Sequence, residues 1–194
     1  MVYKKIIAPI GLLLLLGLAG CSDKSALYEN QDIGKGIEEC VQDGVAAPKW
    51  TCLSEIDGFY STVGIAQKSS AGLAYMRKVA LANGRSELAH QIQTLVKDKI
   101  TIYAGTTGNG ANETVDSATE TITKQVANVD LSNSKAIDVW TSPSGDLYML
   151  VTTPKDGTNE QIRKNLQTSY NNQDALWQQF KSKNALEDLE KEFQ

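Results

Sequence analysis

An apolar stripe at helical spacing between residues 73 and 96 constrains the fold of this chain more than any other feature. Its members are Leu73, Met76, Ala80, Leu88, Ile92, Leu95 and Val96. They recur at steps of three and four residues, and most charged side chains fall on other faces. Gly84 fills the gap in the stripe, although a mid-helix glycine costs about 1 kcal/mol relative to alanine. We therefore predict a long helix that lies very close to a sheet at Gly84.

The residues before this helix have the alternation of a strand. In residues 58–67, one face carries Phe59 and Val63, whereas the other carries small residues that include Gly64 and Ala66. Small residues on one face of a strand indicate that something approaches it closely, either the helix or a ligand in a hollow at Gly64 and Ala66.

Two later strands are expected at residues 136–140 and 146–152, joined by a turn that contains proline and glycine. The predicted fold class is therefore α+β. A long helix packs on a small antiparallel sheet in the order strand–helix–strand–strand. Residues 105–110 are expected to form a loop, and residues 113–128 a weak helix.

The last part of the chain, residues 158–194, reads as an amphipathic helical extension. Thr158 with Gln161 matches a capping box, and Asn171-Asn172 marks a break. The apolar stripe here either docks on its own domain or binds a partner, and the sequence leaves both open. The candidate partner-binding residues are Leu176, Phe180, Leu186, Leu189 and Phe193.

The N-terminus has the order of an export signal. Lys4 and Lys5 precede an apolar run over residues 6–19, which is short for a membrane span. Leu18-Ala19-Gly20-Cys21 then resembles a bacterial lipobox. That resemblance implies cleavage before Cys21 and lipidation of its thiol. The alternative is a buried N-terminal helix with a free cysteine.

Several acyl chains make such an anchor effectively permanent. Ser22, rather than aspartate, follows Cys21, which under enterobacterial sorting rules indicates the outer membrane, with the chain lipid-anchored and facing the periplasm. The chain is acidic, with a formal net charge of −4, and has no basic stripe, which argues against nucleic-acid binding. Attachment to the membrane must therefore come from lipid. The expected segments are a signal peptide (1–20), a lipidated leash (21–47), an α+β domain (48–157) and the helical extension (158–194).

Cys40 and Cys52 are predicted to form a disulfide, because an even cysteine pair in an exported chain meets an oxidising compartment. Closing a loop of this size would stabilise the fold by roughly 2–3 kcal/mol. A metal site and free buried thiols are the alternatives, but no second pair of Cys or His lies nearby.

The sequence shows little chemistry. His90 is the one histidine of the chain, and we expect it to be a solvated surface residue. The glycine-rich stretch Gly105 to Gly110 lacks the lysine of a phosphate-binding loop. No carboxylates have the spacing of metal ligands. We expect no catalytic residue, no metal and no cofactor, and therefore a protein that is not an enzyme.

The ordered part resembles the Lpp-twenty family of exported lipoproteins, which includes a membrane-associated antigen and has flagellum-associated outer-membrane relatives. The resemblance covers residues 48–154. It rests on Pro48-Lys49-Trp50, Gly58-Phe59-Tyr60-x-x-x-Gly64-x-Ala66, Gly84-Arg85-Ser86-Glu87-Leu88-Ala89, Asp138-x-Trp140 and Gly145-x-Leu147-Tyr148-x-Leu150. It implies envelope attachment and no catalytic residues.

Two functions remain open at this stage. The first is a structural or interaction lipoprotein that self-associates or binds envelope proteins, as part of a flagellar or other envelope structure. The second is a lipoprotein that binds an envelope ligand, such as peptidoglycan or a small molecule.

Overall fold

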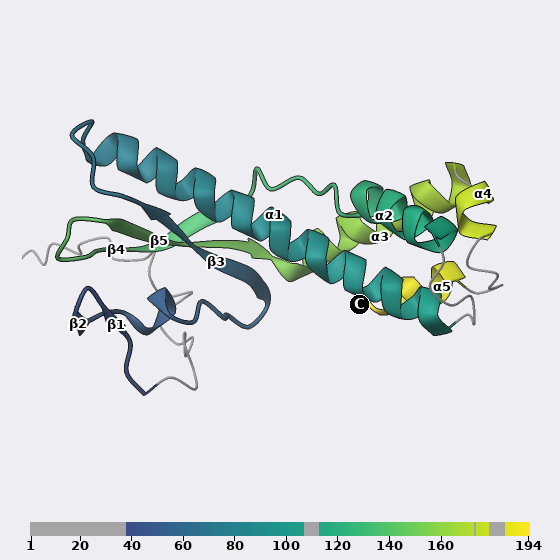
Figure 1. The fold of residues 1–194 in the computed structure, drawn as a ribbon, viewed down its shortest axis with the longest axis horizontal. Helices are drawn as coiled ribbons and strands as arrows, with labels where there is room; N and C mark the ends of the chain where they lie inside the picture. Colours follow the sequence, from purple (N-terminus) through teal and green to yellow (C-terminus); the bar gives the residue numbers. More distant parts are fainter. Residues whose placement is uncertain (1–37, 107–112, 173, 179–184) are drawn as a thin grey trace, which may run out of the picture. The chain divides into compact units, whose positions relative to one another are not determined.

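The structure is a computed structural model that describes residues 38–106, 113–172, 174–178 and 185–194 (Figure 1). All of these residues belong to one compact unit, Gln31–Gln194. Its elements in chain order are β1 (Val41–Gln42), β2 (Val45–Ala46), the 3-10 helix η1 (Lys49–Thr51), β3 (Phe59–Ala66), α1 (Leu73–Thr106), α2 (Glu113–Val126), β4 (Lys135–Thr141), β5 (Leu147–Pro154), α3 (Lys155–Asn172), α4 (Asp174–Trp177) and α5 (Ala185–Lys191).

A three-stranded antiparallel sheet of order β3-β5-β4 forms one side of the unit. Strand β5 lies in the centre and is buried along almost its whole length. Helix α1 directly follows β3 and packs over β3 and β5 (Figure 1). These elements confirm the α+β class and the strand–helix–strand–strand order predicted from the sequence, with α2 inserted before β4.

Helix α1 buries one residue in every four from Met76 to Ala104. The buried positions are Met76, Ala80, Gly84, Leu88, Ile92, Val96, Ile100 and Ala104. A repeat of four residues is longer than the 3.6 residues of one helical turn, so the buried stripe winds around the helix axis as it advances. The first half of α1 therefore faces a different neighbour from the second half.

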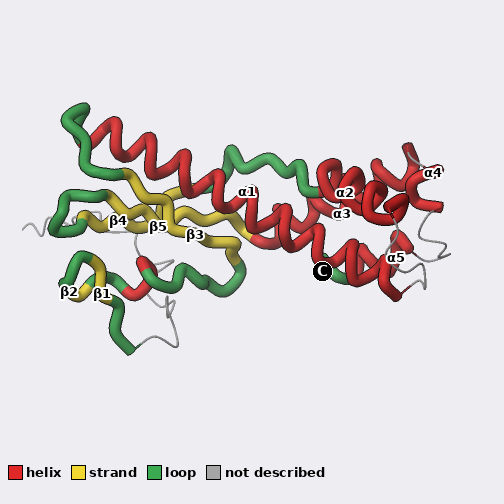
Figure 2. Tube along the Cα trace, viewed as in Figure 1, coloured by secondary structure: helices red, strands yellow, loops and turns green. Residues whose placement is uncertain are grey.

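The two halves of α1 contribute to two separate hydrophobic cores. Met76, Ala80 and Leu88 pack with Leu147, Met149 and Val151 on one face of β5. The second half, from Ile92 onward, packs with apolar side chains of α2, α3 and α5. Figure 2 shows this division, with the strands beside the first part of α1 and the other helices beside its second part.

Two glycines permit the close approach of α1 to the sheet. A Cβ atom added at Gly64 would overlap the backbone carbonyl of Ala80, and one at Gly84 would lie 2.5 Å from Cγ2 of Val151 and 3.4 Å from Cα of Gly64. The two backbones thus lie against each other with no side chain between them. The hydroxyl of Thr62 donates a hydrogen bond to the Gly84 carbonyl oxygen at 3.1 Å, which fixes the helix along β3.

Several elements differ from the sequence-based expectations. Leu73 is 51% exposed and does not belong to the buried stripe, because it lies at the first residue of α1. Helix α1 continues to Thr106, so Gly105 and Thr106 of the expected loop are helical. Helix α3 begins at Lys155, so Thr158 is buried inside the helix and the predicted capping box is wrong. The predicted break at Asn171-Asn172 is correct, whereas residues 107–110 of the expected loop lie outside the described residues.

Replacing Gly84 with leucine should destabilise the fold by about 1–3 kcal/mol, because the added side chain has to displace Val151 or lift α1 from β3. Gly105→Leu is the matched control in the same helix, since a Cβ at Gly105 meets nothing within 4 Å. We expect that control to be neutral or slightly stabilising. Urea unfolding of both variants checks this, and equal effects at the two positions would contradict the assigned helix–sheet contact.

Candidate functional site

Cys40 and Cys52 form a disulfide with an S–S distance of 2.07 Å, which confirms the predicted pair. The bridge closes a segment that contains β1, β2 and η1. The backbone amide of Ala47 also donates to the carbonyl of Cys40 at 2.8 Å. The folded unit therefore includes residues 40–47 of the predicted leash.

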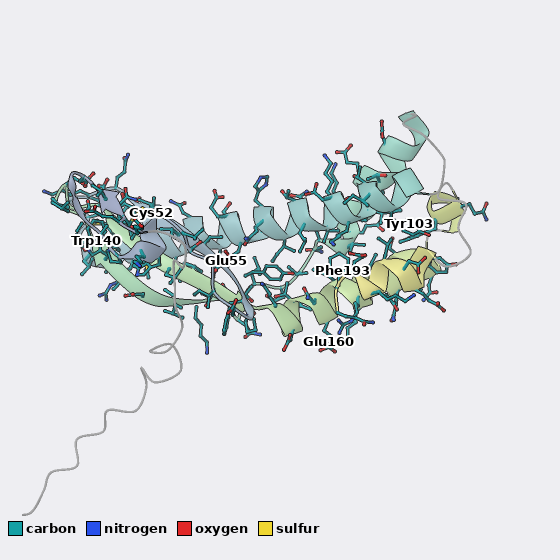
Figure 3. All side chains as sticks on the ribbon, turned by 90° about the horizontal axis from the view of Figure 1, so that it is seen from below. Cys52, Glu55, Tyr103, Trp140, Glu160 and Phe193 are labelled. Carbon is teal, nitrogen blue, oxygen red and sulfur yellow. A yellow bond between two sulfur atoms is a disulfide. The ribbon has the colours of Figure 1, made fainter. Side chains whose placement is uncertain are left out.

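This disulfide-closed segment covers the sheet face opposite α1. Trp50 of this segment and Ile56, which follows the segment, pack there with Tyr148 and Leu150 of β5, and Trp140 packs at the margin of the cluster. The indole nitrogen of Trp50 donates a hydrogen bond of 2.8 Å to Oδ2 of Asp138 on β4. The Trp50 side chain is thus held both by the packing of its ring and by the hydrogen bond of its N–H group. Figure 3 shows Cys52 and Trp140 at this end of the unit.

No pattern in the sequence indicates the bond between Trp50 and Asp138, which are 88 residues apart in the chain. Their pairing depends on the sheet order, because β4 lies beside β5 under the covering segment.

Asp43 joins the tip between β1 and β2 to the β4–β5 turn. The hydroxyl of Ser144 donates a 2.6 Å hydrogen bond to Oδ2 of Asp43. Hydrogen bonds from the side chains of Ser142 and Ser144 lower the pKa of the Asp43 carboxyl from its usual range. Asp43 has a φ of +52°, a left-handed conformation that aspartate tolerates better than most residues.

A shallow groove of about 680 Å³ lies between the disulfide segment, β3 and α1. Its lining residues are Thr51, Cys52, Ser54, Ser61, Thr62, Val63, Ile65, Asn83, Ser86, Glu87, His90 and Gln91. Several of the polar groups are already used inside the fold: Ser54 and Ser61 bond to each other's carbonyl oxygens, and the Asn83 amide donates to the Ile65 carbonyl at 2.7 Å. His90 is exposed at the groove wall.

The hollow expected at Gly64 and Ala66 is absent from this part of the structure. Gly64 lies against α1 and Ala66 is 2% exposed in the core between helix and sheet. The small residues therefore admit the chain's own helix, and the expectation of a ligand there is corrected.

The C-terminal stripe is largely buried within the same unit. Leu189 and Phe193 are each 1% exposed, and Leu186 packs at the edge of the same core. Arg163 holds the end of the chain by donating a 2.7 Å hydrogen bond to the Phe193 carbonyl. Figure 3 shows Phe193 in this interior position. As partner-binding candidates these three residues are corrected, because their side chains are occupied by α1 and α3. Phe180 and the side chain of Leu176 lie outside the described residues.

The β4 edge of the sheet carries features that discourage strand pairing. On β4, the register shifts between Ala136 and Asp138, and Oδ1 of Asp138 accepts a hydrogen bond of 2.7 Å from the amide of Val139. A bulge and a side chain bonded to the edge amide both blunt an edge strand. The expected pairing of the 136–152 hairpin through its backbone edge is therefore not favoured by this geometry. The side chain of Val139 is nevertheless 45% exposed.

Cys21 lies outside the described residues. Within the described part of the chain, none of the helices is both long enough and apolar enough to cross a bilayer. Over those same residues, no three side chains of His, Cys, Asp or Glu gather as a metal site would require.

Comparison with known families identifies the class of protein. Residues 48–154 match the model of the LPP20 lipoprotein family. This match spans more than half of the chain, and the chain therefore belongs to the LPP20 lipoprotein family. Comparison with curated proteins gives no match, and comparison with solved structures gives none either. The family points to an exported, membrane-associated lipoprotein.

The Asp43 bond to Ser144 predicts a defined pH dependence. Because the folded-state pKa of Asp43 is lowered, the carboxylate stabilises the fold above its unfolded pKa of about 3.9, and this stabilisation is lost as pH falls through the folded value. The stability difference between wild type and Asp43→Asn should therefore be largest at neutral pH and shrink below about pH 4. Asp57→Asn, at another exposed carboxylate, is the control. A difference that stays constant to pH 2 would contradict this role.

Proposed function

We propose that this chain is an outer-membrane lipoprotein, anchored through lipid on Cys21, whose folded unit faces the periplasm and has a non-catalytic role in an envelope assembly. The observation that carries the proposal is a lipobox-like Leu18-Ala19-Gly20-Cys21 in a chain that belongs to a lipoprotein family. The disulfide supports it further, because such bonds persist in an oxidising compartment such as the periplasm.

A non-catalytic role is supported by the groove, because many of its polar side chains already bond within the fold and few remain for a substrate. In the groove beside the disulfide, the Ser54, Ser61 and Asn83 side chains are engaged in bonds within the fold. Acid–base chemistry needs titratable groups held in a defined geometry. His90 is exposed, and in its helix it lies beside Glu87 and Gln91 rather than inside a closed pocket.

Val139 marks the surface that we assign to a protein partner, with self-association as the first candidate. It pairs with Met149 on the α1 side of the sheet, but α1 packs over β3 and β5 and leaves Val139 45% exposed. A partner would contact this face through side chains, since the backbone edge of β4 is blunted. A flagellar or other envelope structure is the kind of assembly that this role would serve.

The alternative is an envelope ligand such as peptidoglycan or a small molecule. Such a ligand would use the polar groove beside β3, which has room for a small sugar or peptide fragment. Retention of the mature protein on purified peptidoglycan, lost on His90→Ala, would favour this function over a protein partner.

Cys21→Ser should leave the precursor unprocessed and abolish labelling of the protein by palmitate, because the thiol that accepts the lipid is removed. Gel mobility and metabolic labelling measure the two effects. Cys52→Ser is the control for general loss of a cysteine. Palmitate labelling that persists in the Cys21 variant would contradict the anchor.

A photo-crosslinking residue at Val139 should give a discrete adduct in intact envelopes, since this side chain is exposed on the proposed partner face. The same residue at Lys78, which is exposed on α1, is the matched control and should give none. An adduct of twice the protomer mass indicates self-association, and one of another mass indicates a different protein. Equal or absent adducts at both positions would count against the assembly role.

A further inference from the structure

The two cysteines of the disulfide differ in their exposure to solvent. Cys40 is 3% exposed, and Thr51 Oγ1 lies 3.1 Å from its sulfur. Cys52 is exposed and forms part of the wall of the groove beside β3. A thiol that approaches from solvent can therefore reach the disulfide from the Cys52 side, whereas the Cys40 side is closed by the fold.

The segment held by this bridge has little structure of its own. It contains two strands of 2 residues each and a 3-10 helix of 3 residues. Beyond the disulfide, the contacts that hold it include the bond of Trp50 to Asp138 and that of Asp43 to Ser144. Such short elements are not stable in isolation, so the covalent closure carries much of their order.

The segment nevertheless covers much of one sheet face. Trp50 is 4% exposed, and beneath it Leu150 is fully buried and Tyr148 is 9% exposed. Loosening of the segment would open an apolar surface on β5 that also includes Trp140 of β4. The disulfide thus controls access to a face that is otherwise closed.

We propose that Cys52 is a site of thiol–disulfide exchange, reached through the groove, and that exchange there releases the segment from the sheet. The co-reactant is a monothiol in its thiolate form. Its sulfur bonds to Sγ of Cys52, the bond between Cys52 and Cys40 breaks, and the electron pair leaves on Sγ of Cys40 as a thiolate. The products are a mixed disulfide on Cys52 and a thiolate on Cys40. One sulfur–sulfur bond forms as another breaks, so the step needs no other oxidant or reductant.

Thr51 is placed to assist this step. Its hydroxyl donates to the Pro48 carbonyl at 2.9 Å, while the same oxygen lies 3.1 Å from Sγ of Cys40. A disulfide sulfur carries no proton and can only accept, and in the intact protein the single hydroxyl proton of Thr51 is given to the Pro48 carbonyl. Once Cys40 becomes a thiolate, the hydroxyl can turn from the carbonyl to the stronger, charged acceptor. The departing Cys40 thiolate would therefore have a hydrogen-bond donor beside it, as the Cys52 sulfur has in the Gln42 side-chain amide at 3.6 Å.

The groove also selects among thiols by charge. Of its described lining residues, Glu87 is the one with a fixed charge. A negative wall repels an incoming anion and attracts a cation, although solvent weakens both effects. We therefore expect cysteamine, whose amine is protonated, to react faster than 3-mercaptopropionate, whose carboxylate is ionised.

The test uses the mature, lipidated protein in detergent micelles. It is incubated with cysteamine, free thiols are blocked with N-ethylmaleimide, and the position of each adduct is mapped by mass spectrometry. We expect cysteamine on Cys52 and maleimide on Cys40 in at least about fivefold excess over the reverse pattern, and a loss of this bias in urea, where both sulfurs are exposed. Adducts shared equally under native conditions, or a reaction that occurs only in urea, would overturn the proposal.

Two further measurements test separately the release of the segment and the selection of thiols by charge. Hydrogen exchange at Tyr148 and Leu150 should rise when the adduct forms, and unchanged exchange would contradict release of the segment. At matched thiolate concentrations, Glu87→Gln should reduce the preference for cysteamine over 3-mercaptopropionate, whereas Glu55→Gln, outside the lining residues, should leave it unchanged. Equal effects of the two variants would exclude selection by the groove.

Discussion

The contact between Gly64 of β3 and Gly84 of α1 sets the position of the other described elements. Because neither residue has a side chain, the helix backbone approaches the strand closely enough for the Thr62 hydroxyl to reach the Gly84 carbonyl. This contact lies near the middle of a buried stripe with a four-residue repeat, which winds around α1. The first half of the helix therefore closes the core over the sheet, and the second half closes the core among α2, α3 and α5. One helix thus connects two cores that share few other residues.

The opposite face of the sheet is covered by a different means. No long helix lies on it within the described residues; a short segment closed by the Cys40–Cys52 disulfide places Trp50 on β5 and bonds it to Asp138. This cover lies at the start of the described chain, next to the residues that lead to the proposed anchor at Cys21.

The sequence predicted much of this fold because its signals are local. The alternation in β3, the two glycines and the hairpin of β4 and β5 are each visible within about twenty residues. The predictions failed where contacts between elements distant in the chain determine the structure. Thr158 fits a helix cap by residue type, but α3 starts earlier and buries it. Leu189 and Phe193 form a stripe that the sequence could assign equally to a partner, and only the packing of α5 on α1 and α3 resolves this. The bonds of Trp50 and Asp43 join residues too distant in the chain for any pattern to reveal.

Because α1 contributes to both cores, we expect it to couple the sheet and the helical core into one cooperative unit. Native-state hydrogen exchange on the wild-type protein tests it most directly, with urea added below the unfolding transition. Leu150 reports on the sheet, and Ile122 reports on the helical core, since both are fully buried. If α1 couples the two, the amides of both residues exchange by the same global opening, with equal free energies and equal urea dependence. Exchange of Ile122 through a separate opening of lower free energy would contradict the claim.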